Sequence, residues 1–324
     1  MKQPLILLFG MPRSGTTWLG KIFDSHPDTL YRHEPDSKGT LNTLPIFAKA
    51  NDSDSYRAFL EQYVANLPAI RDEKISASLP VFAKSYYSVP QLALRKMLVF
   101  GTKVASRFLG AMPVPDLVDA SVHPQVRVVW KSIESLGRLG VLARVFPESR
   151  CIIIFRHPCG YVASVMRGEA KRKFEGSIHS SEDWGAFSKL LDTDVARERG
   201  WKLDAVKSMA PVERMALKWA LSYEHALLET AGMDNVIAVR YEDFCEHPGE
   251  EAANAFLHCR LSLTPETENF IRSSTKQEHS EYYSVFKDPK VAAWKWKQEL
   301  MPSDIEKVMG IVSQFKSGAL YPGE

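Results

Sequence analysis

The chain has 324 residues, of which 45% are hydrophobic and 25% are charged. These are ordinary values for a folded globular protein, so they argue against a disordered chain. Lys and Arg together number 41 and Asp and Glu together number 39, which gives a net charge of +2. This balance excludes a broadly basic, nucleic-acid-binding surface, and any affinity for anions must come from cations gathered locally.

Cysteine spacing and hydropathy indicate the kind of environment. The four cysteines form no C-x-x-C pair, which favours buried thiols in a reducing compartment over a disulfide framework. No run approaches the roughly 18 apolar residues of a membrane span, and the apolar start of the chain is shorter than a signal-peptide core. We therefore expect a cytoplasmic protein without a membrane span. The histidines lack the spacing of metal ligands, so we expect no metal site.

The first unit along the chain is a strand, a tight turn and a helix. The apolar run Leu5–Phe9 predicts a buried strand, and residues 18–23 carry apolar side chains at helical spacing. The turn between them, residues 10–17, reads Gly-Met-Pro-Arg-Ser-Gly-Thr-Thr. A turn in this position surrounds an anion with backbone N–H groups and a helix N-terminus. A turn without a ligand is the alternative, but two glycines, three hydroxyl side chains and a cation together favour a phosphate.

This loop departs from the Walker A loop at one position. Gly10 and Gly15 have Walker A spacing, but Thr16 stands where that loop has its lysine. Arg13 is the only cation in the loop. The residues expected to hold the phosphate are Arg13, Ser14, Gly15, Thr16 and Thr17.

Four further apolar runs predict strands. They are residues 29–31, 126–130, 151–155 and 236–239. Their continuous apolar character is typical of strands buried on both faces, and helical patterns lie between the last three. One helix is expected to end near Ser25, ahead of Pro27, and another to run from about Pro211 to Ala231. The sequence therefore predicts an α/β fold with a parallel sheet flanked by helices.

Two regions interrupt this alternation. Residues 36–124 carry scattered aromatic side chains and no strong strand pattern, which favours a mostly helical insertion. We expect this insertion to cover the carboxyl edge of the sheet, where α/β proteins bind ligands, and to form part of the acceptor site. Residues 171–207 are a second, polar insertion. No repeat or low-complexity tract divides the chain, so we expect a single domain over residues 1–324.

Arg156 and Ser164 form a second candidate phosphate site. Arg156 follows the predicted strand at 151–155, and Ser164 falls on the helix after Pro158. An arginine and a serine in these positions can hold a phosphate through charge-assisted hydrogen bonds, although arginines end strands for other reasons too. Together with the first loop, this pair indicates a ligand with two separate phosphate groups.

These motifs resemble those of the sulfotransferases that use 3′-phosphoadenosine-5′-phosphosulfate (PAPS). Residues 12–19, Pro-Arg-Ser-Gly-Thr-Thr-Trp-Leu, resemble the family's 5′-phosphosulfate loop, and Arg156 with Ser164 resembles its 3′-phosphate pair. Residues 239–243, Val-Arg-Tyr-Glu-Asp, are similar to its Y-E-D segment. The resemblance implies a three-layer, P-loop-related fold, PAPS as co-substrate without a metal, and contacts of Trp18 and Tyr241 with adenine.

The resemblance breaks at the residue that acts as base. Cytosolic members carry K-x-H on the strand before the 3′-phosphate strand; here Lys131 keeps the lysine, but Ile133 replaces the histidine. Glu34 resembles the glutamate base of the tyrosylprotein and carbohydrate branches. His33 is the rival base. Without the resemblance, Glu34 would be interpreted as a surface carboxylate beside an arginine.

The segment from Lys287 to Lys297 is the last candidate. Many family members close an R-K-G loop, followed by a tryptophan, over the nucleotide. Here Lys287 stands at the arginine's distance from Trp294, but the glycine is absent. A helix start with solvated lysines is the alternative interpretation.

The resemblance implies transfer of a sulfuryl group from PAPS to an acceptor hydroxyl, with release of adenosine 3′,5′-bisphosphate (PAP). Glu34 would take the proton, while Lys131 and Arg13 stabilise the departing phosphate. Lys131 stands where an NTP enzyme would want a metal-binding aspartate. The expected acceptor is a carbohydrate, glycolipid or other small hydroxylated molecule. A protein-tyrosine acceptor, a P-loop small-molecule kinase and a non-catalytic nucleotide-binding protein are the alternatives.

Overall fold

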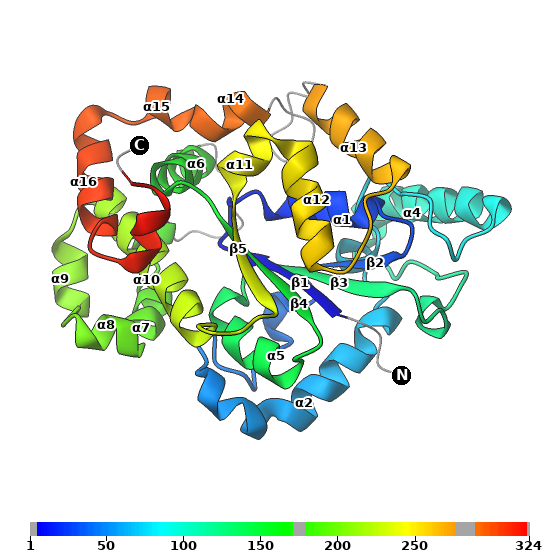
Figure 1. The fold of residues 1–324 in the computed structure, drawn as a ribbon, viewed down its shortest axis with the longest axis horizontal. Coiled ribbons are helices and arrows are strands. Elements are labelled where there is room, and N and C mark those ends of the chain that lie inside the picture. Colours follow the sequence, from blue (N-terminus) through cyan, green and yellow to red (C-terminus); the bar gives the residue numbers. More distant parts are fainter. Residues whose placement is uncertain (1–4, 171–178, 277–288, 323–324) are drawn as a thin grey trace.

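The computed structural model describes residues 5–170, 179–276 and 289–322. At its centre is a five-stranded sheet in the order β2-β3-β1-β4-β5 (Figure 1), in which every neighbouring pair is parallel. The strands are β1 (Leu5–Gly10), β2 (Thr29–His33), β3 (Arg127–Ser132), β4 (Arg150–Phe155) and β5 (Val236–Arg240). Each predicted run corresponds to one of these strands, although β3 begins one residue after its predicted start, at Arg127, and extends through Lys131 and Ser132, beyond its predicted end.

Helices cover both faces of the sheet. Alternate residues of β1 enter two separate cores, Leu7 and Phe9 in one and Ile6 and Leu8 in the other. The first core includes side chains from α5 (Leu139–Val145), α6 (Pro158–Ala170) and α10 (Pro211–Glu229). The second includes side chains from α1 (Thr16–Ser25), α12 (Pro248–His258) and α13 (Pro265–Lys276). The predicted three-layer α/β fold is therefore confirmed.

The boundaries of two helices follow the predicted signals. The first helix, α1, ends at Ser25, and the next residue, His26, is extended with ψ 133°. Extended backbone is what the ring of Pro27 imposes on the residue before it. Helix α10 begins at Pro211 and ends at Glu229, close to the predicted span.

All regular helices of the first insertion lie between β2 and β3. They are α2 (Ser53–Asn66), α3 (Glu73–Ser76) and α4 (Val89–Leu109), and residues 36–124 contain no strand. Helix α2 packs against α5, and α3 packs against β2, the edge strand of the sheet. The remaining helices are α7 (Trp184–Leu191), α8 (Asp194–Glu198), α9 (Leu203–Ser208), α11 (Tyr241–Glu246), α14 (Pro289–Trp294), α15 (Trp296–Glu299) and α16 (Pro302–Val312).

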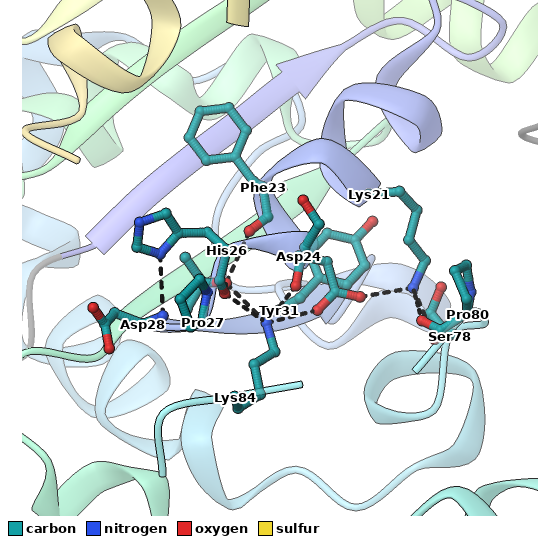
Figure 2. Close-up of polar contacts among 12 residues, drawn as sticks. Lys21, Phe23, Asp24, His26, Pro27, Asp28, Tyr31, Ser78, Pro80 and Lys84 are labelled. Carbon is teal, nitrogen blue, oxygen red and sulfur yellow. Dashed lines mark hydrogen bonds and ion pairs between the residues drawn. The ribbon is translucent and has the colours of Figure 1, made fainter. Parts of the chain in front are cut away.

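A buried charge cluster ties the insertion to α1 (Figure 2). Asp24 of α1 accepts from Lys21 Nζ at 2.7 Å and pairs with Lys84 Nζ of the insertion at 3.2 Å. Lys21 Nζ also donates to the carbonyl of Ser78 at 2.8 Å. Burial alone would raise the pKa of Asp24, but the two lysines outweigh it and hold that pKa below its usual range. The insertion is thus held to α1 by buried ionic contacts.

Candidate functional site

The strand register brings the candidate site residues to one edge of the sheet. Gly10 at the end of β1 lies opposite Ile154 in β4, and His33 at the end of β2 lies opposite Lys131 in β3. Because the strands are parallel, their carboxyl ends meet at the same edge. This edge carries the end of β3 and the residues that directly follow the other strands, which are the loop after β1, Glu34, Arg156 and Tyr241. Open α/β sheets bind their ligands at this edge.

The loop after β1 has the backbone of an anion-binding turn. Arg13 and Gly15 adopt left-handed conformations, with φ 71° and 82°. Gly15 precedes α1, and no side chain caps the N-terminus of this helix. A Cβ atom on Gly15 would collide with the ring of Tyr241, so glycine is required on steric grounds as well. In the first turn of α1 the Trp18 N–H donates to the Gly15 carbonyl at 3.1 Å, and the N–H groups of Thr16 and Thr17 lie ahead of it at the helix N-terminus, where an anion is favoured.

The hydroxyl of Tyr223 in α10 holds this loop through hydrogen bonds. It accepts from the Met11 N–H at 3.3 Å, lies 2.9 Å from Ser14 Oγ and donates to the carbonyl of Ile154 at 2.7 Å. Ser14 is fully buried, so its hydroxyl serves to hold the loop. The sequence did not reveal Tyr223, because a tyrosine within an apolar helix reads as an ordinary core residue.

The two candidate phosphate sites are joined to each other. Arg13 Nε donates to Ser164 Oγ at 3.1 Å, and the Arg156 guanidinium donates to the Arg13 carbonyl at 2.7 Å. The Arg156 guanidinium also lies over the Tyr241 ring, 5.1 Å from its centroid. Arg156 Nε is buried and has no hydrogen-bond partner in the described part of the chain. Buried donors of this kind are few in folded proteins, and each one requires an explanation.

Arg167 is a third arginine at this place, which the sequence did not single out. It lies one helical turn after Ser164, and its guanidinium is 3.5 Å from Ser164 Oγ. It also pairs with Glu299 in α15. The spacing of three residues along α6 is the signal that could have revealed it.

The C-terminal helices lie against Arg156. The guanidinium of Arg156 donates to the Ala292 carbonyl of α14 at 3.2 Å, and the Trp296 ring stacks on His157 with centroids 4.3 Å apart. Trp294 Nε1 donates to Glu246 at 3.1 Å. Lys287, the residue predicted to resemble the nucleotide-closing arginine, lies outside the described residues.

Glu34 and Lys131 form an ion pair at the β2–β3 side of the edge. Lys131 Nζ donates to Glu34 Oε1, and the Glu34 N–H donates to the Lys131 carbonyl at 2.8 Å. Burial lowers the pKa of Lys131, and the Glu34 carboxylate only partly offsets this effect. The Lys131 side chain is 1% exposed, whereas that of Glu34 is 23% exposed. The carboxylate can therefore meet a ligand while the lysine lies beneath it.

His33 lies between Tyr31 and Glu34. Its Nδ1 is 2.9 Å from the Tyr31 hydroxyl, and its Nε2 is 3.7 Å from Glu34 Oε1. Burial, with Lys131 and Lys21 nearby, lowers the pKa of His33 to about 3. The imidazole is therefore neutral at pH 7.

Asp36 fixes the turn that carries Glu34. The sequence indicated Asp36 only as the start of the insertion and not as a residue of the site. Its carboxylate accepts from Trp130 Nε1 at 3.1 Å and from the hydroxyls of Ser132 and Ser135. Asp36 is 1% exposed. These bonds hold the chain two residues beyond Glu34 against the end of β3.

Backbone strain is concentrated at the same edge. Among the described residues, three that are not glycine have positive φ, and two of them are Arg13 and Glu34. Such conformations are unfavourable for residues with a Cβ atom and persist where the surrounding structure enforces them. Both residues are thus held in fixed positions at the candidate site.

Residues 5–170, 179–276 and 289–322 contain neither a cluster of metal ligands nor a membrane-spanning helix. No three His, Cys, Asp or Glu side chains gather as metal ligands there. None of the helices in these ranges has the length and apolar character needed to cross a bilayer.

Comparisons with known proteins find several sulfotransferases of solved structure. Similar solved structures include the sulfotransferase domain of the curacin biosynthetic pathway, with 14% identity, TM-score 0.46 and coverage of 97% of this chain and 98% of that chain. The sulfotransferase domain of the Synechococcus PCC 7002 olefin synthase has 15% identity, TM-score 0.45 and coverage of 96% and 95%. A mouse sulfotransferase solved with PAP has 12% identity, TM-score 0.43 and coverage of 99% and 88%.

Sequence comparison gives the decisive match. No curated protein sequence matches this chain. The family model described as the sulfotransferase family, however, matches residues 4–265, which include every described residue of the loop after β1, Glu34, Lys131, Arg156 and Tyr241. The chain therefore belongs to the sulfotransferase family.

Proposed function

We propose that this sulfotransferase takes its sulfuryl group from PAPS and transfers it to the hydroxyl of an acceptor, releasing PAP. The observation that carries this proposal is that Arg13 joins the loop after β1 to the second candidate phosphate site, Arg156 with Ser164. Arg13 belongs to the loop after β1 and bonds Ser164, while Arg156 bonds the Arg13 carbonyl. A ligand with phosphate groups at both of its ends fits such an arrangement, and PAPS has a 5′-phosphosulfate and a 3′-phosphate.

The residues at the edge of the sheet suit this donor. The first turn of α1 and Thr16 and Thr17 supply N–H and hydroxyl donors for the 5′-phosphosulfate. Arg156, whose hydrogen bonds go to neutral carbonyls and whose Nε has no partner among the described residues, supplies charge for the 3′-phosphate. Trp18 and Tyr241, which lie edge to face with centroids 6.4 Å apart, offer aromatic surface to the adenine.

Glu34 is the proposed base. It accepts the proton of the acceptor hydroxyl as the oxygen attacks sulfur; the new O–S bond forms while the bond from sulfur to the phosphate oxygen breaks, and its electron pair leaves with PAP. Lys131, which pairs with Glu34, is the residue that we propose to stabilise the negative charge on the leaving oxygen. As in phosphoryl transfer, positioning and charge stabilisation supply most of the acceleration.

The geometry favours Glu34 over His33 as the base. The Tyr31 hydroxyl is buried, and burial raises its pKa well above the usual value, so it stays protonated. We propose that this hydroxyl donates to His33 Nδ1, 2.9 Å away, which puts the imidazole proton on Nε2, the nitrogen that faces Glu34. In that tautomer neither ring nitrogen is open to accept a proton from a substrate. His33 then positions the carboxylate, and Glu34 accepts the proton.

A kinase activity is less well supported. A P-loop kinase needs the Walker lysine and a carboxylate that holds Mg²⁺, but this chain has Thr16 in the loop and Lys131 near the end of β3. Asp36 does lie beside that strand, yet its oxygens already accept from Trp130, Ser132 and Ser135. Neither of the two kinase requirements is met by these residues.

The test is transfer of labelled sulfate from PAPS to a panel of glycans, glycolipids, phenols and tyrosine peptides, with and without EDTA. We expect labelled product with at least one hydroxylated acceptor, at the same rate in EDTA. Phosphate transfer from ATP that EDTA abolishes would identify a kinase instead. PAP binding without any turnover would identify a nucleotide-binding module.

A further inference from the structure

The outward face of α4 is apolar along its whole length. Seven of the fifteen large hydrophobic side chains that are exposed in the described chain belong to this helix; they are Val89, Leu94, Met97, Phe100, Val104, Phe108 and Leu109. A surface helix normally buries its apolar stripe and exposes polar residues, and α4 does the reverse. Figure 1 shows α4 at the periphery, beyond α1 and β2.

Four of the exposed residues form one continuous stripe along α4. Met97, Phe100, Val104 and Phe108 follow one another at intervals of three and four residues, so they share a face. They are 70%, 67%, 41% and 82% exposed.

The opposite face is fixed to the protein. The Arg95 guanidinium donates to the carbonyls of Pro115 and Ser76 and pairs with Asp116 at 3.1 Å, and Val99 is buried. These contacts set the rotation of α4, and with it the outward direction of the stripe.

The charges on α4 are all of one sign. The 21-residue helix contains four cations and no Asp or Glu. Two of the cations pair with carboxylates elsewhere, Arg95 with Asp116 and Lys103 with Glu73. Lys96 and Arg107 are exposed and make no ion pair with other described residues. Together with Lys103, they lie along one border of the apolar stripe, at intervals of seven and four residues.

We propose that α4 lies in the interface of a membrane that contains anionic lipids. Phe100, Phe108 and Met97 would enter the boundary between headgroups and acyl chains, while Lys96 and Arg107 would meet the lipid phosphates. A second copy of this chain fits less well, because α4 against α4 would bring together two cationic helices that have no carboxylate. The proposal concerns a surface outside the catalytic edge and does not rest on the proposed donor or base.

The test is vesicle flotation with the full chain. Vesicles of phosphatidylcholine alone are compared with vesicles that also contain about one third phosphatidylglycerol. We expect binding to the mixed vesicles that weakens as salt is raised. The double variant F100S/F108S should bind at least about tenfold more weakly. Leu257→Ser, at a position in α12 that is 77% exposed, is the matched control and should bind as the wild type does.

A charge variant keeps the test decisive if the double Phe variant is poorly folded. K96E/R107E retains the apolar face and should lose the preference for anionic vesicles while keeping the thermal midpoint of the wild type. Failure of the wild type to bind either kind of vesicle would overturn the proposal. So would a dimer in sedimentation velocity that F100S/F108S converts to a monomer, because α4 would then be an interface between copies.

Discussion

On the β4 side of the sheet edge, Arg156 donates to two main-chain carbonyls, whereas on the β2–β3 side Lys131 donates to the Glu34 carboxylate. Neutral partners orient the arginine without cancelling its charge, so it can still attract a phosphate. The carboxylate neutralises the lysine, so this pair adds little net charge and instead places a proton acceptor beside a cation. We infer that the first side binds the nucleotide, and that the second carries out the proton transfer and stabilises the leaving oxygen.

The strongest test of this division is Glu34→Gln. The amide keeps the shape of the side chain but cannot take the acceptor's proton, so we expect turnover to fall by about 10²–10⁴-fold. PAP affinity, measured by calorimetry, should change little because Glu34 lies on the other side of the edge from Arg156. The exposed Glu250→Gln is the control and should keep full activity. Near-normal turnover of Glu34→Gln would show that another group is the base.

Arg156→Ala tests the other side. Removal of the guanidinium should weaken PAP binding by about 10–100-fold, the amount expected for charge-assisted hydrogen bonds, while ADP binding changes far less. Titrations of both nucleotides measure the two effects. Arg272→Ala, at an exposed position in α13, should leave both affinities unchanged. An equal loss for PAP and ADP would show that Arg156 does not contact a 3′-phosphate.

Tyr223→Phe sharpens the comparison by weakening the loop after β1 and its attachment to β4. The change removes the hydroxyl that bonds Met11, Ser14 and Ile154, and the buried partners left behind should lower the free energy of unfolding by about 1–3 kcal/mol. Chemical denaturation measures this change. Tyr161, an equally buried tyrosine of α6, provides the matched Phe variant. If both variants are equally stable, the hydroxyl of Tyr223 does not hold the loop.

Acid should lower the stability of the fold through both sides of the sheet edge, because each side contains a buried histidine. Burial lowers the pKa of His33 and of His157 to about 3, while in the unfolded chain both take up a proton near pH 6.5. The unfolded state therefore binds more protons, and stability falls as the pH drops from about 6.5 towards 3.

Each histidine contributes at most about 1.4 kcal/mol per pH unit to this fall. His33→Gln and His157→Gln should each flatten the pH dependence of the unfolding free energy, measured by denaturant titration between pH 7 and pH 4. A slope that neither substitution changes would mean that these imidazoles are protonated in the folded protein.

The sheet and the turn between β1 and α1 could be predicted from sequence because their signals are local. The apolar runs of β1 and β4 are continuous, and the glycines at 10 and 15 have a recognisable spacing. The residues that support the site could not be predicted in this way. Tyr223 meets Ser14 across 209 positions, and Asp36 meets Ser132 across 96, so only the folded packing reveals them. Likewise, the sequence contains the apolar residues of α4 but does not indicate which of them face outward.

The binding of PAP and ADP to the wild-type chain, measured side by side by calorimetry, tests the central claim without knowledge of the acceptor. A site built for a 3′-phosphate through Arg156 should bind PAP at least about tenfold more tightly than ADP. Equal affinities, or tighter binding of ADP, would contradict PAPS as the donor.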